Sequence, residues 1–419
     1  MSLTNGTNMY GPFTPTSENV QPYDNVHITN PNQGPPLYVH STGSLQYVRA
    51  PPEPEQTTGS DEIYDIRSPA QFRGISFSKY KKLDVRTQFI DSMLKGKIEP
   101  ACHWCAELVC AGHYGDVWEM ILYYMAKHIH LGNPKLAIYL EMRYDVFRNI
   151  MSQGFNLNEL ELRNNEKIRK LFAEIICTLT LSSKKPSFEA IKINKEEEFD
   201  MTQMTERLKA PSMVFAEPVF RPKDPKELFI ACNEFAYNLS STNPNMMAAC
   251  YWIEWIVEFD QICKKRKQPC RCERRSSNPV ENKYQLDIIW IFWDILQYYC
   301  EKRQNPLIEK TLNALLRLFC VKYTTAACKK RRYMLYYAVG LLTEPVSMNV
   351  DILPNRQMLQ TVVDKIGEVY KQIKKNEEKP KTEYLFHGLE RQRALDRSMK
   401  QMEIMNSMDL AKHNPNTHS

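Results

Sequence analysis

The chain has 419 residues, of which 43% are hydrophobic, which is enough to form packed cores in two or three domains of ordinary size. Its 55 basic and 49 acidic residues leave a net charge of +6, which permits a nucleic-acid or acidic partner without requiring one. The 14 glycines form neither GxxxxGK[ST] nor GxGxxG, so the common nucleotide-hydrolysing and dinucleotide-dependent enzymes are excluded.

The first 72 residues have the composition of a disordered tail. Ten of the 25 prolines lie there, and no lysine occurs before Lys79. Such a segment cannot bury enough apolar surface to offset its ordering entropy, so we predict that residues 1–72 are disordered. No charged region followed by an apolar stretch marks a secretory signal. We therefore expect an intracellular protein, in the host cytoplasm or the virion if it is viral, whose 12 cysteines remain thiols in a reducing compartment.

From about residue 75, apolar residues recur every three or four positions, which is typical of amphipathic helices. The most apolar stretch, residues 286–300, contains Asp287 and Asp294 and is shorter than the roughly twenty residues of a membrane span, so no membrane segment is expected. The sequence predicts an all-α fold with the following parts: helical repeats at 75–182 and 225–345, a charged connector at 183–224, C-terminal helices at 355–407 and a flexible tail at 408–419.

The two helical segments resemble each other, which indicates an internal repeat. Pro-Ala-Cys-His-Trp ending at Trp104 matches Ala-Ala-Cys-Tyr-Trp ending at Trp252, and the helical stretch that begins at Trp118 matches the one that begins at Trp293. An Asn-Pro pair follows in each copy, at residues 133–134 and 305–306. We expect all four tryptophans to anchor the core between helices, in two related helical-hairpin units.

The second copy contains an insertion, residues 260–286, that holds the densest basic cluster of the chain. Its cations are Lys264, Lys265, Arg266, Lys267, Arg271, Arg274 and Arg275. A second cluster, Lys329, Lys330, Arg331 and Arg332, is predicted to open a helix, where positive charge opposes the helix dipole. An acidic or phosphate-bearing partner would explain both clusters, although a solvated surface accounts for the insertion equally well.

Three cysteines of the insertion, Cys263, Cys270 and Cys272, have the residue type of a zinc site that would order the loop. The fourth ligand is not evident, and C-x-C is not the usual zinc-binding spacing, so buried or solvated thiols are the simpler interpretation. A second alternative is a redox-sensitive pair, because nearby arginines would lower the pKa of the thiols.

The first helical repeat resembles the C-terminal helical domain, similar to a clamp-loader collar, of the replication-associated recombination ATPases (the RarA/MgsA group). About 45 residues carry the resemblance, through Ser92-Met93, Ala101, Trp104, Ala106, Ala111-Gly112, Leu122, Met125-Ala126 and Pro134. The ATPase domain of that family is missing, so the resemblance implies a scaffold or oligomerising module near replication machinery and not ATP hydrolysis. The whole chain also resembles uncharacterised proteins of large nucleocytoplasmic DNA viruses.

We find no motif for nucleophilic or metal-dependent catalysis and assign no catalytic residues. The sequence therefore favours a non-enzymatic helical scaffold that binds nucleic acid, or a replication or transcription assembly, through the two basic clusters. The alternative is a structural or assembly protein of a large DNA virus particle that binds other protein subunits. No cofactor is expected apart from the candidate zinc, and protein partners and oligomerisation fit either function.

Overall fold

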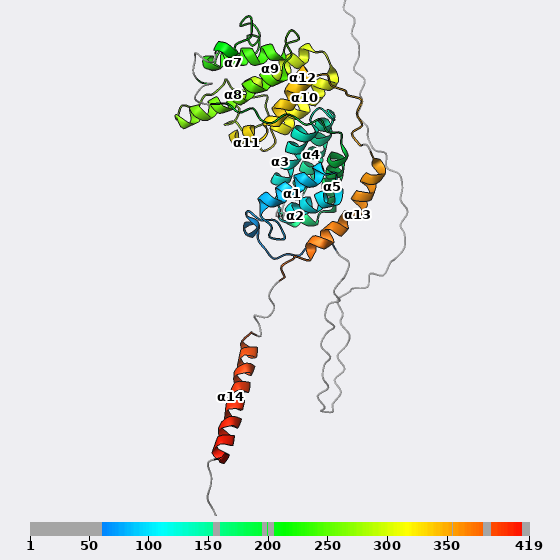
Figure 1. The fold of residues 1–419 in the computed structure, drawn as a ribbon, viewed down its shortest axis with the longest axis vertical. Helices are drawn as coiled ribbons and strands as arrows, with labels where there is room; N and C mark the ends of the chain where they lie inside the picture. The colour runs from blue at the N-terminus through cyan, green and yellow to red at the C-terminus, as the bar shows by residue number, and fades with distance from the viewer. Residues whose placement is uncertain are drawn as a thin grey trace, which may run out of the picture. The chain divides into compact units, whose positions relative to one another are not determined.

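The computed structural model describes residues 61–153, 160–194, 199, 205–353, 355–379 and 387–412, and it confirms the predicted all-α fold (Figure 1). In these residues no β-strand occurs, and β pairing is limited to two bridges, which join Ile75 to Lys81 and His130 to Lys185. Over the same ranges, no helix is both long enough and apolar enough to cross a membrane.

Five helices and one π-helical turn form the first half of the fold. They are α1 (Lys82–Leu94), α2 (Ile98–Cys110), α3 (Tyr114–Tyr124), η2 (Met125–Ile129), α4 (Leu136–Gln153) and α5 (Glu166–Leu181). Gly96 and Gly112 follow α1 and α2 with φ values of +70° and +76°, the left-handed conformation that ends helices at little cost for glycine. The Asn165 side chain accepts a hydrogen bond from the backbone N–H of Ile168 and so caps the first turn of α5.

Six helices form the second half. They are α7 (Phe229–Leu239), α8 (Met246–Lys265), α9 (Ile289–Lys302), α10 (Pro306–Phe319), α11 (Thr325–Lys330) and α12 (Arg332–Thr343). Asn245 and Asn305 cap α8 and α10, and Pro306 occupies the first helical position, where its missing N–H costs nothing. The predicted Asn-Pro boundary of the second repeat is therefore the start of α10.

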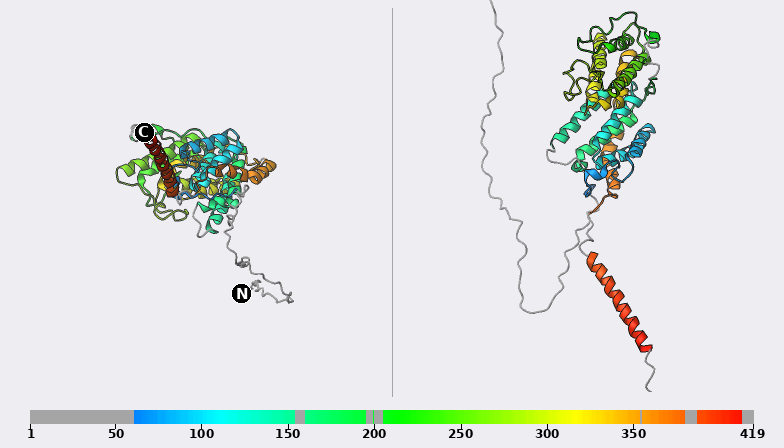
Figure 2. Two further views of the ribbon diagram at one scale, coloured as in Figure 1. Left: turned by 90° about the horizontal axis from the view of Figure 1, so that it is seen from below. Right: turned by 90° about the vertical axis from the view of Figure 1, so that its left-hand side faces the viewer.

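The helix contacts support the predicted internal repeat. In the first half, α1 contacts α2, α3 and α5, α2 contacts α3 and α5, and α4 contacts α5. The second half repeats each of these pairings when α7, α8, α9, α10 and α12 replace α1 to α5 in order, and α11 is an addition. In the right-hand view of Figure 2 the second half lies above the first, and the two contact each other through α3, η2 and α4 of the first half and α10 and α12 of the second.

Three of the four predicted tryptophan anchors lie in the core. Trp118, Trp252 and Trp293 are buried, with at most 3% of the residue exposed. Trp104 is only partly buried and packs edge-to-face against Tyr80, so its prediction as a core anchor is wrong. Trp104 and Trp252 occupy matching positions in the two copies but have different surroundings, because a further helix packs against α2.

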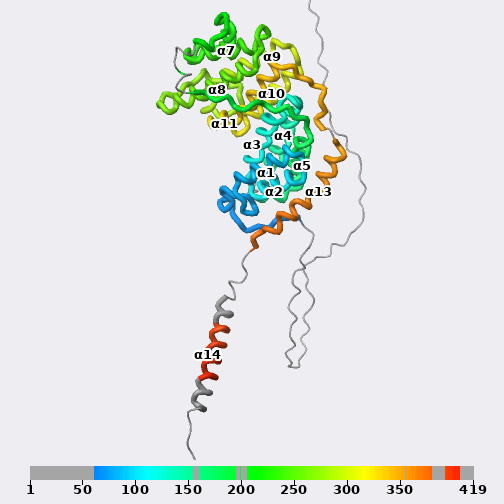
Figure 3. Tube along the Cα trace, viewed as in Figure 1, coloured from blue at the N-terminus to red at the C-terminus, as the bar shows by residue number. Residues whose placement is uncertain are grey.

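That further helix is α13 (Arg356–Lys374), which packs against α2 and α5 (Figure 3). Ile366, Tyr370 and Ile373, spaced four and three residues apart, are its buried residues. A last helix, α14 (His387–Lys412), carries exposed side chains throughout residues 392–405. Residues 408–412 of the predicted flexible tail are therefore helical, and residues 413–419 lie outside the described part of the chain.

The segment that precedes α1 is ordered from residue 61. Ile63 and Phe72, the last residue of η1 (Pro69–Phe72), are buried, so the prediction of disorder is wrong for residues 61–72. Residues 1–60 lie outside the described residues. The start of the connector also packs against the fold, since the Ser187 N–H donates to the carbonyl of Lys127 and the Phe188 ring contacts Tyr336.

Candidate functional site

The predicted basic insertion begins inside α8. Lys264 and Lys265 form its last turn, Arg266 is the C-cap, and Lys267 follows with a φ of +59°. All four side chains are exposed, as is Arg271. The carbonyl end of a helix carries partial negative charge, so this end of α8 favours the cations that the sequence places there.

The second basic cluster lies beside α8. Lys329 Nζ donates a hydrogen bond to Glu258 Oε1 of α8 at 3.2 Å. Asp260 of α8, which pairs with Lys264, lines a small cavity together with Thr325 and Cys328 of α11. Lys329 and Lys330 end α11, where positive charge suits the helix dipole. Arg331 and Arg332 are the N-cap and the first residue of α12, so the prediction that the cluster opens a helix is confirmed for these two and wrong for the two lysines.

These contacts bring cations from two segments of the chain to one surface. We call it the α8 basic surface and define it by Lys264, Lys265, Arg266, Lys267, Arg271, Lys329 and Lys330. Two acidic residues of α8 are already engaged, because Asp260 pairs with Lys264 and Glu258 pairs with Lys329. Five members of the surface form no ion pair with any residue that the structure describes: Lys265, Arg266, Lys267, Arg271 and Lys330.

Arg275 does not belong to this surface, and its prediction as a nucleic-acid contact is wrong. Its guanidinium is fully buried and forms ion pairs with Asp224 and Asp294. A side chain with no exposed surface cannot reach a phosphate, so Arg275 instead fixes the insertion to the core. Arg274 is exposed, and its guanidinium donates to the carbonyl of Asn282 at 3.2 Å.

Arg331 and Arg332 also have structural roles in place of the predicted nucleic-acid contacts. Arg331 is buried, pairs with Glu119 of the first half and donates to the carbonyl of Phe319. Arg332 Nη1 lies 2.9 Å from Oε2 of the buried Glu254. Both guanidinium groups therefore neutralise carboxylates within the protein.

The three cysteines of the insertion do not assemble the candidate zinc site. Among the described residues, no group of three or more His, Cys, Asp or Glu side chains could hold a metal ion. The Cys272 thiol donates to the carbonyl of Asp287 at 3.3 Å. Burial raises the pKa of the Cys263 thiol, and it raises the pKa values of Cys270 and Cys272 to about 12. Arg266 and Arg275 do act to lower the pKa of Cys263 and Cys272, as predicted, but burial outweighs them, so the predicted net lowering is wrong.

A cysteine from outside the insertion lies near Cys270 and Cys272, and the sequence did not indicate it. Cys232, on α7, is fully buried, and nearby Cys270 and Cys272 add to the rise in its pKa that burial causes. All twelve cysteines of the chain are free thiols. At neutral pH these buried thiols stay protonated and behave as small apolar side chains.

A groove of about 830 Å³ separates one face of α13 from α2. Trp104 and His103 of α2 line it, opposite Val362, Lys365 and Val369 of α13. The sequence did not indicate this groove, because the groove depends on how α13 packs against α2. Val362 and Val369 are half-exposed at the edge of the buried face of α13, and the buried Ile366 also lines the groove.

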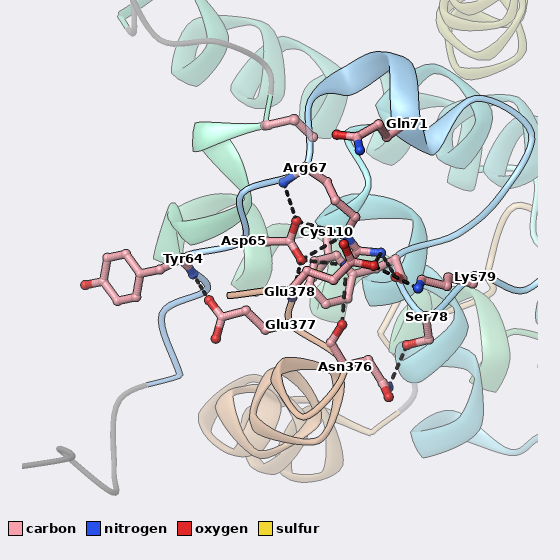
Figure 4. Close-up of polar contacts among 12 residues, drawn as sticks. Tyr64, Asp65, Arg67, Gln71, Ser78, Lys79, Cys110, Asn376, Glu377 and Glu378 are labelled. Carbon is pink, nitrogen blue, oxygen red and sulfur yellow. Dashed lines mark hydrogen bonds and ion pairs between the residues drawn. The ribbon is translucent and has the colours of Figure 1, made fainter. Parts of the chain in front are cut away.

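A buried carboxylate holds the end of α13 in place (Figure 4). Asp65 Oδ2 accepts hydrogen bonds from Arg67 Nη2 at 2.6 Å and from the backbone N–H of Glu378 at 2.9 Å. The Asn376 side chain also donates to Ser78 Oγ at 2.8 Å. Burial alone would raise the pKa of Asp65, but the bonds from Arg67 and Glu378 hold it below its usual value. These contacts join the two ends of the fold and set the position of the groove.

No protein-family model, no curated protein and no solved structure matches the chain. The site must therefore be interpreted from its own residues.

Proposed function

We propose that this protein is a non-enzymatic helical scaffold that binds nucleic acid through the α8 basic surface. One observation carries the proposal: two basic segments, about sixty residues apart in sequence, meet beside α8 with five cations outside any ion pair with the described residues. Phosphate groups are the partners that such a surface suits, since each contact releases counterions from the nucleic acid.

The surface suits backbone recognition more than base recognition. Its members are mainly lysines, which contact phosphate as point charges, and Arg266 and Arg271 are its two guanidinium groups. We expect binding that depends on charge and tolerates many sequences. The resemblance of the first repeat to the replication-associated ATPases agrees with a role near replicating DNA.

The proposal is tested by fluorescence anisotropy of labelled single-stranded and forked DNA with the full chain. The test variant replaces Lys265, Arg266, Lys267 and Lys330 with Ser. A matched control replaces four other exposed cations, Arg86, Lys97, Lys167 and Lys310, so both variants lose the same charge. Circular dichroism establishes that each variant keeps its helices.

We expect the test variant to bind DNA about tenfold or more weakly than the wild type, because it loses several phosphate contacts. The control should bind within about threefold of the wild type, since only its general charge has changed. Equal losses in both variants would show that net charge and not this surface drives binding. No binding at low salt would contradict the proposal.

A further inference from the structure

α13 carries a stripe of residues along the groove, at the edge of its buried apolar face, and the buried Ile366 also lines the groove. Five of its residues that line the groove, Met358, Val362, Lys365, Val369 and Gln372, are spaced four, three, four and three residues apart. This is the spacing of a helix face that packs against another helix in a coiled coil. The stripe is not fully covered by α2, since Met358 is 42% exposed.

α14 carries a stripe with the same spacing. Leu395, Met399 and Met402 lie four and three residues apart and are 60%, 54% and 70% exposed. At 100° per residue they fall within about 60° of one another around the helix, so they form one face. Arg397 lies on the opposite face of α14. Three large apolar side chains on one exposed face are typical of a contact surface.

We propose that α14 packs antiparallel to α13 in the groove between α2 and α13 of the same chain. The pair would form an αα-hairpin in which Leu395, Met399 and Met402 cover the groove.

The length of the connection allows this packing. The chain is held at Glu378, whose carbonyl accepts from the N–H of Ile66 at 3.2 Å. Residues 380–386 then lead to His387, and seven residues span about 25 Å at most. The end of α13 is only four residues before Glu378, at Lys374, so α14 can begin beside it.

The register of the hairpin follows from the equal rise of the two helices. If α14 begins level with the end of α13, Leu395 lies level with about residue 366 and Met402 with about residue 359. Met402 would then lie beside Met358, and Asp396 near Lys365. The groove residues on α13 and the stripe on α14 therefore coincide along the pair.

The tether favours α14 of the same chain over α14 of a second copy. A short connection gives the attached helix an effective concentration in the millimolar range, well above the concentration of a second molecule in a dilute solution. A helix supplied by another copy or by a different protein would have to displace it.

Photo-crosslinking of the full chain tests the proposal. p-Benzoylphenylalanine replaces Met402 in one variant and Arg397 in a control, both at exposed positions of α14. After irradiation of a dilute sample, peptide mass spectrometry identifies the crosslinked residues. Electrophoresis separates crosslinks within one chain from those between two chains.

We expect position 402 to crosslink within one chain to α2 or to the first half of α13, and position 397 to give none of these products. Adding Val362→Glu to the position-402 variant should remove most of them, because a charge then lies in the groove. Crosslinks between two chains would overturn the proposal in favour of exchange between copies. Equal yields from positions 402 and 397, or no groove crosslink from 402, would overturn it entirely.

Discussion

Arg275 and Asp224 form an ion pair in which neither side chain has exposed surface. Arg275 Nη2 donates to Asp224 Oδ2 at 2.7 Å, and its Nε donates to Asp294 Oδ2 at 2.9 Å. The backbone N–H of Glu273 also donates to Asp224 at 2.8 Å. These contacts join Arg275 of the insertion to Asp224, which precedes α7, and to Asp294 of α9. They hold the loop that follows the α8 basic surface against the core.

Arg275→Ala should lower the free energy of unfolding by about 3–5 kcal/mol, because it leaves the Asp224 carboxylate buried without its partner. Urea denaturation at pH 7 measures the change. The neighbouring Arg274→Ala removes an exposed cation and should change stability by about 0.5 kcal/mol or less. If Arg275→Ala has no larger effect than Arg274→Ala, the pair does not fix the insertion.

The same pair predicts a dependence on pH. Burial would raise the pKa of Asp224, but hydrogen bonds from Arg275 and two backbone N–H groups hold it below its usual value. A carboxyl whose pKa is lower in the folded state stabilises the protein at neutral pH, and this contribution is lost as the pH falls through its folded pKa. The difference in unfolding free energy between wild type and Arg275→Ala should therefore shrink below about pH 4. A constant difference down to pH 3 would contradict this assignment.

His130 gives a second pH effect in a higher range. Burial, assisted by Lys185, lowers its pKa from 6.5 to about 4. The unfolded state then binds more protons than the folded state between these values, so stability falls as the pH is lowered from 6.5 to 4, by up to about 3 kcal/mol. His130→Asn should flatten this part of the profile, because Asn does not titrate. Parallel profiles for the two proteins would show that His130 is not the group responsible.

The two halves should be coupled through Tyr337. Its hydroxyl, on α12, donates to the carbonyl of Pro134 in the first half at 2.9 Å. Tyr337→Phe removes this bond without changing the packing and should cost about 1 kcal/mol in the free energy of unfolding. Tyr80→Phe, at a residue that is 50% exposed, is the control and should be nearly neutral. Equal effects would indicate that the hydroxyl of Tyr337 does not contribute to joining the halves.

Substitution of the matched tryptophans should reveal the asymmetry of the repeat. Trp252→Ala should destabilise the protein by about 3–5 kcal/mol, because it empties a buried site. Trp104→Ala should cost about 1–2 kcal/mol, because its ring lines the groove and is partly exposed. Thermal and urea unfolding of both variants measure the difference, and equal losses would mean that Trp104 is a core residue after all.

The sequence was sufficient for the helices and for the repeat, because both depend on local apolar spacing and on capping residues such as Asn305. It could not distinguish Arg274 from Arg275. The two are neighbours in the same basic run, and the partner that buries Arg275 lies 51 residues away, at Asp224. Arg331 is a similar case, because its partner Glu119 belongs to the other half of the fold. The sequence gives the number of cations in each cluster, but contacts with residues far away in the sequence determine which of them are exposed to solvent.

The groove was missed for a related reason. Helical periodicity alone groups Val362, Ile366 and Tyr370 on one side of α13, since all three are apolar and four residues apart. Only the packing of α13 against α2 and α5 buries Ile366 and Tyr370 and leaves Val362 half-exposed at the groove. That position depends on Asp65 and Arg67, which belong to a segment with the composition of a tail.

The salt dependence of DNA binding tests the central claim most directly. The association constant of the full chain for forked DNA is measured between 50 and 300 mM salt, beside the variant that lacks Lys265, Arg266, Lys267 and Lys330. We predict that affinity falls steeply with salt for the wild type, and that the slope of log K against log salt shrinks by roughly three to four in the variant, close to one for each lost phosphate contact. The same slope in both proteins, or no measurable binding at 50 mM salt, would contradict nucleic-acid binding through the α8 basic surface.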